Sequence, residues 1–461
     1  MTTKSPPTRS AAADRSGAPA PASQPAAARP TARAARTTYR SVFAAGEFRV
    51  LFAALLMYVL GFEFEILGLS VLIFDQTRSP LLTALAFSMG FAPQVIGGAL
   101  FTSLADRLPP RLVIGTGLLT RSGPGLVIGL WPGLPVPAML ALVAAAATVA
   151  PIFTATTSGL LPDILDGDRY VLGRSVFSLT GSGTQILGLG LGGAVLAVWP
   201  ARWLLVAAGT SLALAAVIIR LGLRRRPARR GRNAGPAHDV GTARGAHSDA
   251  SRPRGVIRTT VAGHLELLAD RKVRGLLLAQ WLPAWFVTGA EALIVPYTRS
   301  LDHPASAASP LLAAVPAGML LGDVIVGRYC RPALRERLAF PLAVAMGLPL
   351  VVLIARPPLP LAAVALLVCG FGFAYELGLQ RAFLDSLPDG LRGQAFGLNA
   401  TGGMGGQGLF PLAVGGLAAA FGAGTAIGIA GLATVLAALA LRAPLTGRWR
   451  DRLSGRSRDI G

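Results

Sequence analysis

The sequence is poor in the residues that catalytic and metal-binding sites most often use. Its 461 residues include two cysteines, four histidines and two lysines. Cys330 and Cys369 fall in or next to different hydrophobic segments, which argues against a structural disulfide or a thiolate metal site. No histidine lies in the middle of such a segment, and neither lysine belongs to a G-x-x-x-x-G-K-[ST] phosphate loop. We therefore expect no catalytic residues, no metal and no cofactor, and the chain is not predicted to be an enzyme.

Charge is also scarce. Only 14% of the residues are charged, against about 25% in soluble domains, while 52% are hydrophobic and the mean hydropathy is +0.57. This composition excludes an ordinary soluble protein and makes the lipid bilayer the expected surroundings. The net charge of +21 could suggest a nucleic-acid partner, but arginine-rich cytoplasmic loops of a membrane protein explain it better, so no nucleic acid is expected.

Hydrophobic segments of roughly the ~20 residues that a bilayer requires recur along the chain. We predict twelve membrane spans, near residues 49–74, 81–104, 112–131, 136–158, 172–199, 203–222, 273–298, 309–328, 338–355, 359–382, 393–420 and 424–442. Between the sixth and seventh spans lies a basic strip, residues 223–258, with ten arginines against two aspartates. It is rich in Pro, Gly, Ala and Ser and cannot bury an apolar core.

The spans and the strip together predict a domain organisation. Residues 256–272 carry apolar positions at helical spacing and are expected to form an interfacial helix that leads into the seventh span. The predicted parts are a disordered N-terminal tail at 1–45, a six-helix bundle at 46–222, a tether with its interfacial helix at 223–272, a second six-helix bundle at 273–442, and a basic C-terminal tail at 443–461. An even number of spans places both termini on one side, and the arginine bias makes that side the cytoplasm of a plasma-membrane protein.

The two halves of the sequence echo each other. The paired segments are Ser79-Pro80-Leu81-Leu82 with Ser309-Pro310-Leu311-Leu312, Leu161-Pro162-Asp163 with Leu387-Pro388-Asp389, and Gln185 with Gly192-Gly193 against Gln407 with Gly415-Gly416. These echoes indicate a duplicated six-span unit. The predicted fold is all-α, with twelve transmembrane helices in two pseudo-symmetric bundles and a substrate site between them near the middle of the bilayer.

The turn after the second span reads Leu104-Ala105-Asp106-Arg107-Leu108-Pro109-Pro110-Arg111. It resembles the G-x-L-A-D-R-x-G-R-R loop of the major facilitator superfamily, matching at Asp106, Arg107 and Arg111. Thr102 stands where that loop begins with Gly, and Pro109-Pro110 replaces the Gly-Arg pair. A carboxylate and arginines at such a turn can dock onto a neighbouring helix end and act as a conformational latch. The alternative is a solvated turn that only obeys the positive-inside rule.

Other short motifs are similar to the macrolide-efflux and siderophore-exporter branch of that superfamily. They are Phe48-Arg49, Thr77-Arg78-Ser79-Pro80 and Arg392-Gly393-Gln394-Ala395-Phe396-Gly397-Leu398. Gly188-Leu189-Gly190-Leu191-Gly192-Gly193 resembles the end of an antiporter motif, although plain helix packing explains these glycines equally well. The resemblance spans about residues 46–442 and implies proton-linked export of amphipathic small molecules such as a drug, an antibiotic or a siderophore.

We single out five charged residues inside predicted spans, where a charge costs on the order of 2.5–3.5 kcal/mol on insertion scales and usually serves a pathway. They are the proton-coupling or cavity candidates Glu65, Glu291, Glu63, Glu376 and Arg121. Glu63 and Glu65 point to nearly opposite helix faces, so only one can face a given cavity. Glu65 and Glu291 share the offset of the Leu-Pro-Asp echo and are the first choice, with Arg121 as a counter-charge. Ion pairs that only hold spans together are the alternative.

Aromatic residues cluster near these acids in the sequence. We predict that Phe62, Trp285, Phe373 and Tyr375 line a pocket for an apolar or cationic ligand, with packing as the alternative. The predicted function is secondary active transport: the protein would export a small molecule by alternating access, coupled to protons. The protein is expected to be a monomer. A nutrient or siderophore importer on the same fold, and a transport-dead membrane sensor or scaffold, are the alternatives.

Overall fold

The computed structural model describes residues 38–105, 108–227, 262–388 and 391–446, and all regular structure in these ranges is helical. Twelve helical segments are long and apolar enough to cross a membrane. Each of them coincides with one of the twelve spans expected from the sequence. The predicted fold class, an all-α membrane protein with two sets of six spans, is therefore confirmed.

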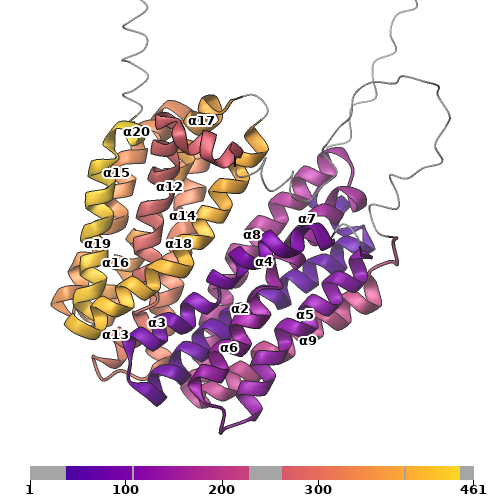
Figure 1. The fold of residues 1–461 in the computed structure, drawn as a ribbon, viewed down its shortest axis with the longest axis horizontal. Coiled ribbons are helices and arrows are strands. Elements are labelled where there is room, and N and C mark those ends of the chain that lie inside the picture. Colours follow the sequence, from indigo (N-terminus) through magenta and orange to yellow (C-terminus); the bar gives the residue numbers. More distant parts are fainter. Residues whose placement is uncertain (1–37, 106–107, 228–261, 389–390, 447–461) are drawn as a thin grey trace, which may run out of the picture. The chain divides into compact units, whose positions relative to one another are not determined.

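The helices follow one another along the chain as the colours of Figure 1 show. Their bounds are α1 Tyr39–Phe43, α2 Gly46–Thr77, α3 Pro80–Met89, α4 Ala92–Ala105, α5 Pro110–Leu130, α6 Val136–Ala147, α7 Ala150–Ile164, α8 Gly167–Val198, α9 Ala201–Gly222, α12 Arg271–Glu291, α13 Ile294–Arg299, η1 Ala305–Ala307, α14 Ala308–Tyr329, α15 Pro332–Val351, η2 Val352–Ala355, α16 Leu359–Gly372, α17 Tyr375–Ser386, α18 Arg392–Phe421, α19 Ala423–Ala440 and α20 Arg442–Thr446.

Local sequence explains where several of these helices begin. The Ser79 side chain accepts a hydrogen bond from the backbone N–H of Leu82 at 3.3 Å, and Pro80 follows as the first helical residue of α3. The Asp270 side chain accepts from the backbone N–H groups of Lys272 and Val273 at the start of α12. A side-chain cap satisfies free backbone donors, and proline at the first position has no donor to satisfy.

Four spans differ from the continuous helices expected from the sequence. The second span breaks at Gly90, the fourth at Thr148, the seventh at Ala292 and the tenth at Phe373, so that each consists of two consecutive helices. Around these breaks the backbone N–H of residue i donates to the carbonyl of residue i−3 in place of i−4, as from Gly90 N to Phe87 O and from Phe373 N to Gly370 O. Irregular backbone at membrane depth is tolerated where it is buried in protein or lines a cavity.

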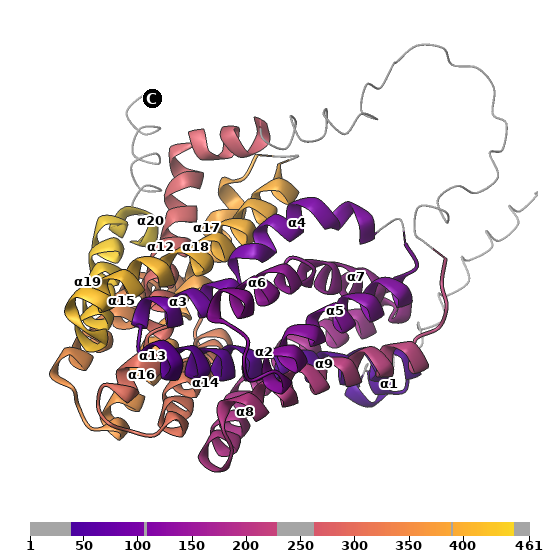
Figure 2. The same cartoon turned by 60° about the horizontal axis from the view of Figure 1, so that its bottom comes forward.

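The two halves repeat the same packing. Helices α2 and α5 both pack against α9, and α12 and α15 both pack against α19; α5 lies beside α9, and α15 beside α19, in both Figure 1 and Figure 2. In terms of spans, the first and third pack on the sixth, and the seventh and ninth on the twelfth. This equivalence is what a duplicated six-span unit predicts.

Small residues allow the close approach of these helices. A Cβ on Gly347 of α15 would lie 2.5 Å from the carbonyl oxygen of Gly431 on α19. On α2, a Cβ on Gly61 would lie 2.9 Å from the Leu212 side chain of α9. Neither position can carry a side chain unless the helices move apart, so glycine fixes the spacing of the bundles.

The sequence echoes also define contacts between the two halves. A Cβ on Gly193 of α8 would lie 2.5 Å from the Cβ of Ser309 on α14, and one on Gly415 of α18 would lie 2.6 Å from the Cβ of Ala84 on α3. Gly193 and Gly415 belong to echoing segments, and the residues that they approach, Ser309 on one side and Pro80 and Leu81 on the other, belong to echoing segments too. Both contacts lie towards the ends of the spans farthest from residues 223–227 and 271, which we call the distal end; the other end is the tether end.

The start of the tether is held against the first span. Glu47 of α2 forms an ion pair with Arg226, with 2.7 Å between Oε2 and Nη2, and its other carboxylate oxygen accepts from the backbone N–H of Arg224. Residues 262–269 are helical and lead into α12, in the stretch where an interfacial helix was expected. The rest of the tether, at 228–261, and most of the two predicted tails lie outside the described residues.

Candidate functional site

A cavity of about 210 Å³ lies between the two halves; we call it the central cavity. It contains two carboxyl groups, Glu63 from α2 and Glu291 from the end of α12, together with two amides, Gln185 and Gln407. The remaining lining residues are Phe62, Ile66, Phe87, Phe91, Leu189, Thr288, Leu312, Pro316, Met319 and Phe373. No lysine, arginine or histidine is among them, so the two acids share a largely apolar space without a cation beside them.

Helix packing places Glu63 in this cavity. Glu63 is only 6% exposed. It packs against Gly188 of α8, where an added Cβ would lie 3.1 Å from the Glu63 Cβ. One turn further along α8, a Cβ on Gly192 would lie 2.9 Å from the Leu67 side chain. The glycines of the predicted antiporter-like stretch thus bring α8 close to α2 and leave room for the Glu63 side chain.

Three of the helix breaks lie at the central cavity. Phe91 follows the break in the second span, Glu291 precedes the break in the seventh, and Phe373 lies in the break of the tenth. Discontinuous helices near the membrane midplane are a recurrent feature of transporter binding sites, because their free backbone groups can face a ligand. The breaks therefore mark the same place as the acids.

A second cavity, of about 370 Å³, lies within the second half; we call it the C-half cavity. It adjoins the central cavity, since Thr288, Met319, Phe373 and Gln407 line both. The other lining residues are Gln280, Trp281, Ala284, Trp285, Asp323, Glu376, Leu377, Gln380, Asn399 and Gly403. Again none of them is lysine, arginine or histidine.

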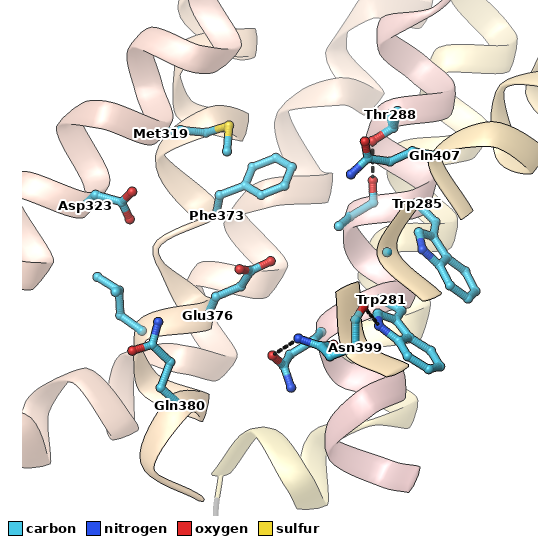
Figure 3. A pocket seen from close by; sticks show the side chains of 14 residues that line it. Trp281, Trp285, Thr288, Met319, Asp323, Phe373, Glu376, Gln380, Asn399 and Gln407 are labelled. Carbon is cyan, nitrogen blue, oxygen red and sulfur yellow. Dashed lines mark hydrogen bonds between the residues drawn. The ribbon is translucent and has the colours of Figure 1, made fainter. Parts of the chain in front are cut away.

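The walls of the C-half cavity differ in chemistry. Figure 3 shows Asp323 of α14 and Glu376 of α17 on one side, and Asn399 of α18 and the two tryptophans of α12 on the other. The Asn399 Nδ2 donates to Gln280 Oε1 at 3.2 Å, and the Trp281 Nε1 donates to the Asn399 backbone carbonyl at 3.0 Å. These bonds fix the amide wall, while the Asn399 Oδ1 is buried and accepts no hydrogen bond.

The two tryptophans are held by glycines. Trp281 and Trp285 stack with ring centroids 5.6 Å apart and an interplanar angle of 13°. A Cβ on Gly402 would overlap the Trp281 ring, and one on Gly406 the Trp285 ring. The glycines of α18 therefore form a flat surface against which the two indole rings pack. The glycine-rich stretch of α18 and the two tryptophans of α12 are visible in the sequence and could have suggested this contact.

The structure corrects the placement of Glu65, the first-choice cavity acid. Glu65 is not among the residues that line these two cavities; its Oε1 accepts from the Arg121 Nη1 of α5 at 3.4 Å, and both side chains are buried. Arg121 also lies over the Phe62 ring, 5.6 Å from its centroid. Because Glu63 and Glu65 point to opposite faces of α2, Glu63 shares the cavity with Glu291 and Glu65 faces the interior of the first half.

The aromatic predictions divide in the same way. Phe62 lines the central cavity, Trp285 the C-half cavity and Phe373 both. Tyr375 lines neither of these two cavities; it is fully buried and its hydroxyl donates to the Gln280 backbone carbonyl at 2.8 Å. Its role in the structure is to join α17 to α12.

Sequence reasoning missed several polar lining residues. Gln185 and Gln407 were noted only as a repeat, although both line the central cavity. Asp323 was missed, although a lone acid in a hydrophobic span is a recognisable signal. Gln280, Gln380 and Asn399 carry no charge, and nothing in their spacing separates them from other polar residues of the spans.

The predicted latch lies only partly in the described structure. Asp106 and Arg107 are outside the described residues. Arg111, in the first turn of α5, donates from Nη2 to the backbone carbonyl of Arg220 near the end of α9. A cation at a helix C-terminus is favourable because the last carbonyl groups have no partners within the helix. The arginine thus joins the third and sixth spans at the tether end.

Twelve apolar spans in two equivalent sets, with acids in a cavity between them, define a secondary transporter of small molecules in a membrane. The family model of the Major Facilitator Superfamily matches residues 41–411. The chain belongs to this superfamily, and it is a transporter and not an enzyme. A search of curated proteins finds no match.

Solved structures of transporters share the fold at low sequence identity. A bacterial homolog of the human lysosomal transporter Spinster, in an inward-facing and unoccupied conformation, has 17% identity and a TM-score of 0.63, covering 88% of this chain and 97% of its own. The nucleoside transporter NupG has 12% identity and a TM-score of 0.67, covering 87% and 99%. A peptide transporter POT in complex with sulfate has 15% identity and a TM-score of 0.62, covering 87% and 95%.

Proposed function

We propose that the protein is a proton-coupled exporter of an amphipathic small molecule in the plasma membrane. The observation that carries the proposal is the pair Glu63 and Glu291, which face one cavity from the two halves without a cation among the lining residues. Two negative charges in a poorly hydrated space repel each other. Protonation of either acid removes this repulsion, so proton binding favours the closure of the halves around the cavity.

The domain organisation follows from this mechanism. Residues 46–222 would rock against residues 273–442 around the central cavity, with the tether at 223–272 joining them and both termini in the cytoplasm. The contacts of Gly193 with Ser309 and of Gly415 with Ala84 close the distal end, which is then the external end. Arginine in the tether and beside the tether-end turns supports this orientation.

Reconstitution in proteoliposomes tests this function. With an imposed pH gradient, a protein inserted in one orientation should move an amphipathic substrate against its concentration gradient, in the direction opposite to proton flow. Co-transport of substrate with protons would replace the exporter by the importer. A folded protein that never moves substrate, with or without a gradient, would refute transport coupling altogether.

Glycine contacts at the distal end predict a conformational trap. Replacing both Gly193 and Gly415 by Leu should prevent this end from closing, because even a Cβ would lie about 2.5 Å from the facing side chains. Substrate transport should fall at least about tenfold, since closing the distal end would then cost more than about 1.4 kcal/mol. A thiol introduced at the distal end should become more accessible to a membrane-impermeant maleimide.

Neighbouring glycines provide the matched control for this trap. Gly190 lies on the same helix as Gly193, and Gly416 is adjacent to Gly415, but a Cβ at either control position meets no atom within 4 Å. The double Leu variant at Gly190 and Gly416 should transport at close to the normal rate. Equal losses in both double variants would show that added bulk harms the bundle in general, and the trap would be wrong.

An ion pair joins the two halves at the distal end. The Arg299 Nη2 of α13 lies 2.6 Å from the Asp75 Oδ1 of α2, and both side chains are partly exposed. Such pairs contribute about 0.2–1 kcal/mol. Asp75→Asn should therefore shift the conformational equilibrium towards distal opening by about 1.4- to 5-fold.

A charge swap tests whether the pair itself has this effect. The double variant Asp75→Arg and Arg299→Asp should restore the equilibrium that either single charge change disturbs. Distal opening can be measured by the distance between spin labels placed on the two halves. If the swap is as open as the single variants, local packing and not the ion pair accounts for the shift.

A further inference from the structure

The C-half cavity has more hydrogen-bond acceptors and negative charge than its own residues satisfy. Asp323 and Glu376 project from neighbouring helices, and no ion pair involves either of them among the described residues. The Asn399 Oδ1 on the opposite wall is buried and accepts no hydrogen bond.

One buried acid of the first half, Glu65, differs from the acids of the C-half cavity. Glu65 has its counter-ion, Arg121, inside the same bundle. Asp323 and Glu376 have no such neighbour, and the adjoining central cavity adds Glu63 and Glu291 but no cation. Across both cavities the lining carries four carboxyl groups and no lysine, arginine or histidine. This charge balance disfavours an anionic ligand and favours one that brings its own positive charge.

The apolar residues of the lining indicate what the uncharged part of the ligand is like. Trp285, Phe373 and Met319 border the same space, and a cavity of about 370 Å³ falls within the ~300–1,000 Å³ range of small-molecule sites. The Trp285 Nε1 is buried and has no acceptor. A ligand with an apolar or aromatic body and one protonated amino group fits this combination.

We propose that the C-half cavity is the substrate's cation subsite: Asp323 and Glu376 bind a protonated amine, while Trp285, Phe373 and Met319 contact its apolar body. The inference rests on the proposed transport function and adds the charge of the substrate to it. It also separates two tasks in the adjoining cavities. Glu63 and Glu291 handle protons between the halves, and Asp323 and Glu376 hold the substrate within the second half.

Equilibrium binding to the full-length protein in nanodiscs, without any gradient, tests the subsite. Three probes share one fluorophore: dansylcadaverine carries a primary amine, its N-acetyl derivative is neutral, and dansyl-6-aminohexanoic acid is anionic. The wild-type protein should bind the amine at least about tenfold more tightly than either of the other two, since loss of a charged hydrogen-bonded pair weakens binding by about that factor or more. Equal affinities, or no saturable amine binding up to millimolar concentration, would overturn the proposal.

Substitutions then locate the site. Asp323→Asn with Glu376→Gln should weaken amine binding at least about tenfold and leave binding of the neutral probe within about twofold. Asp302 provides the control, because it is an exposed acid outside both cavities with φ of 58°, a left-handed conformation that Asn accepts. Asp302→Asn should change neither affinity. A double variant that loses both probes equally would indicate damage to the cavity, and the wild-type probe series would then decide alone.

Failure of the subsite and failure of the proposed function give different results. If the protein drives a neutral compound against a pH gradient but binds the amine no better, the cation subsite is wrong and proton-coupled export stands. If the amine binds selectively but no gradient drives its movement, the subsite stands and the coupling is wrong. The binding assay contains no gradient, so neither result depends on the other.

Discussion

Replacing Glu63 or Glu291 by Gln is expected to abolish transport that is driven by a pH gradient. The loss should be at least about tenfold for each single variant, while exchange of substrate across the membrane without a gradient should continue. Gln resembles the protonated carboxyl group in shape but cannot release a proton. The substituted position therefore stays uncharged and the repulsion between the two acids is permanently removed. Protonation of the remaining acid then no longer relieves a repulsion between the halves, and the proton gradient can no longer supply energy to the cycle.

The position of the two acids supports this expectation. Each comes from a different half, and both face the central cavity. Glu63 is held against Gly188 of α8, and Glu291 lies immediately before the break between α12 and α13. A change of charge at either residue can thus affect how the halves approach each other, whereas an acid buried within one bundle affects only that bundle.

Separate measurements distinguish loss of coupling from loss of folding. Uptake into proteoliposomes with an imposed pH gradient reports coupling, and counterflow of labelled substrate reports the conformational cycle. Glu266→Gln is the control, because Glu266 is exposed beside α12 and lies in neither cavity. Normal gradient-driven transport by both single Gln variants would show that these acids do not carry obligatory coupling.

The number and position of the spans could be predicted because each depends on a local property. A segment of about 20 apolar residues satisfies its backbone only as a helix in lipid, whatever its neighbours do. Prolines and capping residues then set the ends, as Ser79 and Pro80 do for α3. The breaks at Thr148 and Phe373 could not be predicted in this way, because they depend on how neighbouring spans pack.

The identity of the cavity acid needed the three-dimensional structure. The apolar residues of α2 are spread around the whole helix, so hydrophobic periodicity could not show which face contacts the partner half. The Leu-Pro-Asp echo pairs Glu291 with Glu65, whereas Glu63 is the acid that lines the central cavity with Glu291. The number of residues that separates echoing positions changes along the chain, so one echo does not fix the partner of Glu291. Two residues apart on one helix, the two acids face opposite ways, and the packing of Gly188 against Glu63 shows which face meets α8.

Only some of the residues that line the C-half cavity could be identified from the sequence. Glu376, Trp285 and Phe373 were singled out by type, since acids and aromatics in spans are unusual or bulky. Asn399 could not be, because its place in the cavity wall depends on its hydrogen bonds with Gln280 and Trp281, which only the structure reveals. The sequence shows which chemical groups are present, but not which of their atoms have hydrogen-bond partners in the fold.

The second large effect concerns stability and the pair Glu65 and Arg121. Each single substitution, Glu65→Gln or Arg121→Gln, is expected to lower the free energy of unfolding by about 3–5 kcal/mol. Side-chain exposure is 4% for Glu65 and 2% for Arg121, with 3.4 Å between the charged atoms. Removing one partner leaves the other charge buried without compensation, and burial of an unpaired charge is far less favourable than burial of a pair.

Restoring neutrality should recover this stability. In the double variant Glu65→Leu with Arg121→Met no buried charge remains, and replacing a buried ion pair by apolar residues of similar volume is often neutral or stabilising by about 1–4 kcal/mol. Thermal unfolding in detergent should therefore give low midpoints for both single variants and a nearly normal midpoint for the double variant. Additive losses would show that the two charges are not coupled.

The same double variant also separates the two glutamates of α2. If Glu65 only neutralises Arg121, transport by the double variant should still respond to a pH gradient, because Glu63 and Glu291 remain in the central cavity. The Glu63→Gln variant should show the reverse: a stable fold without gradient-driven transport. Two residues apart on one helix, the acids then have opposite phenotypes, which follows from their opposite faces. A stable double variant that has lost its response to the gradient would place proton coupling at Glu65, and the assignment of the coupling acid to Glu63 would be wrong.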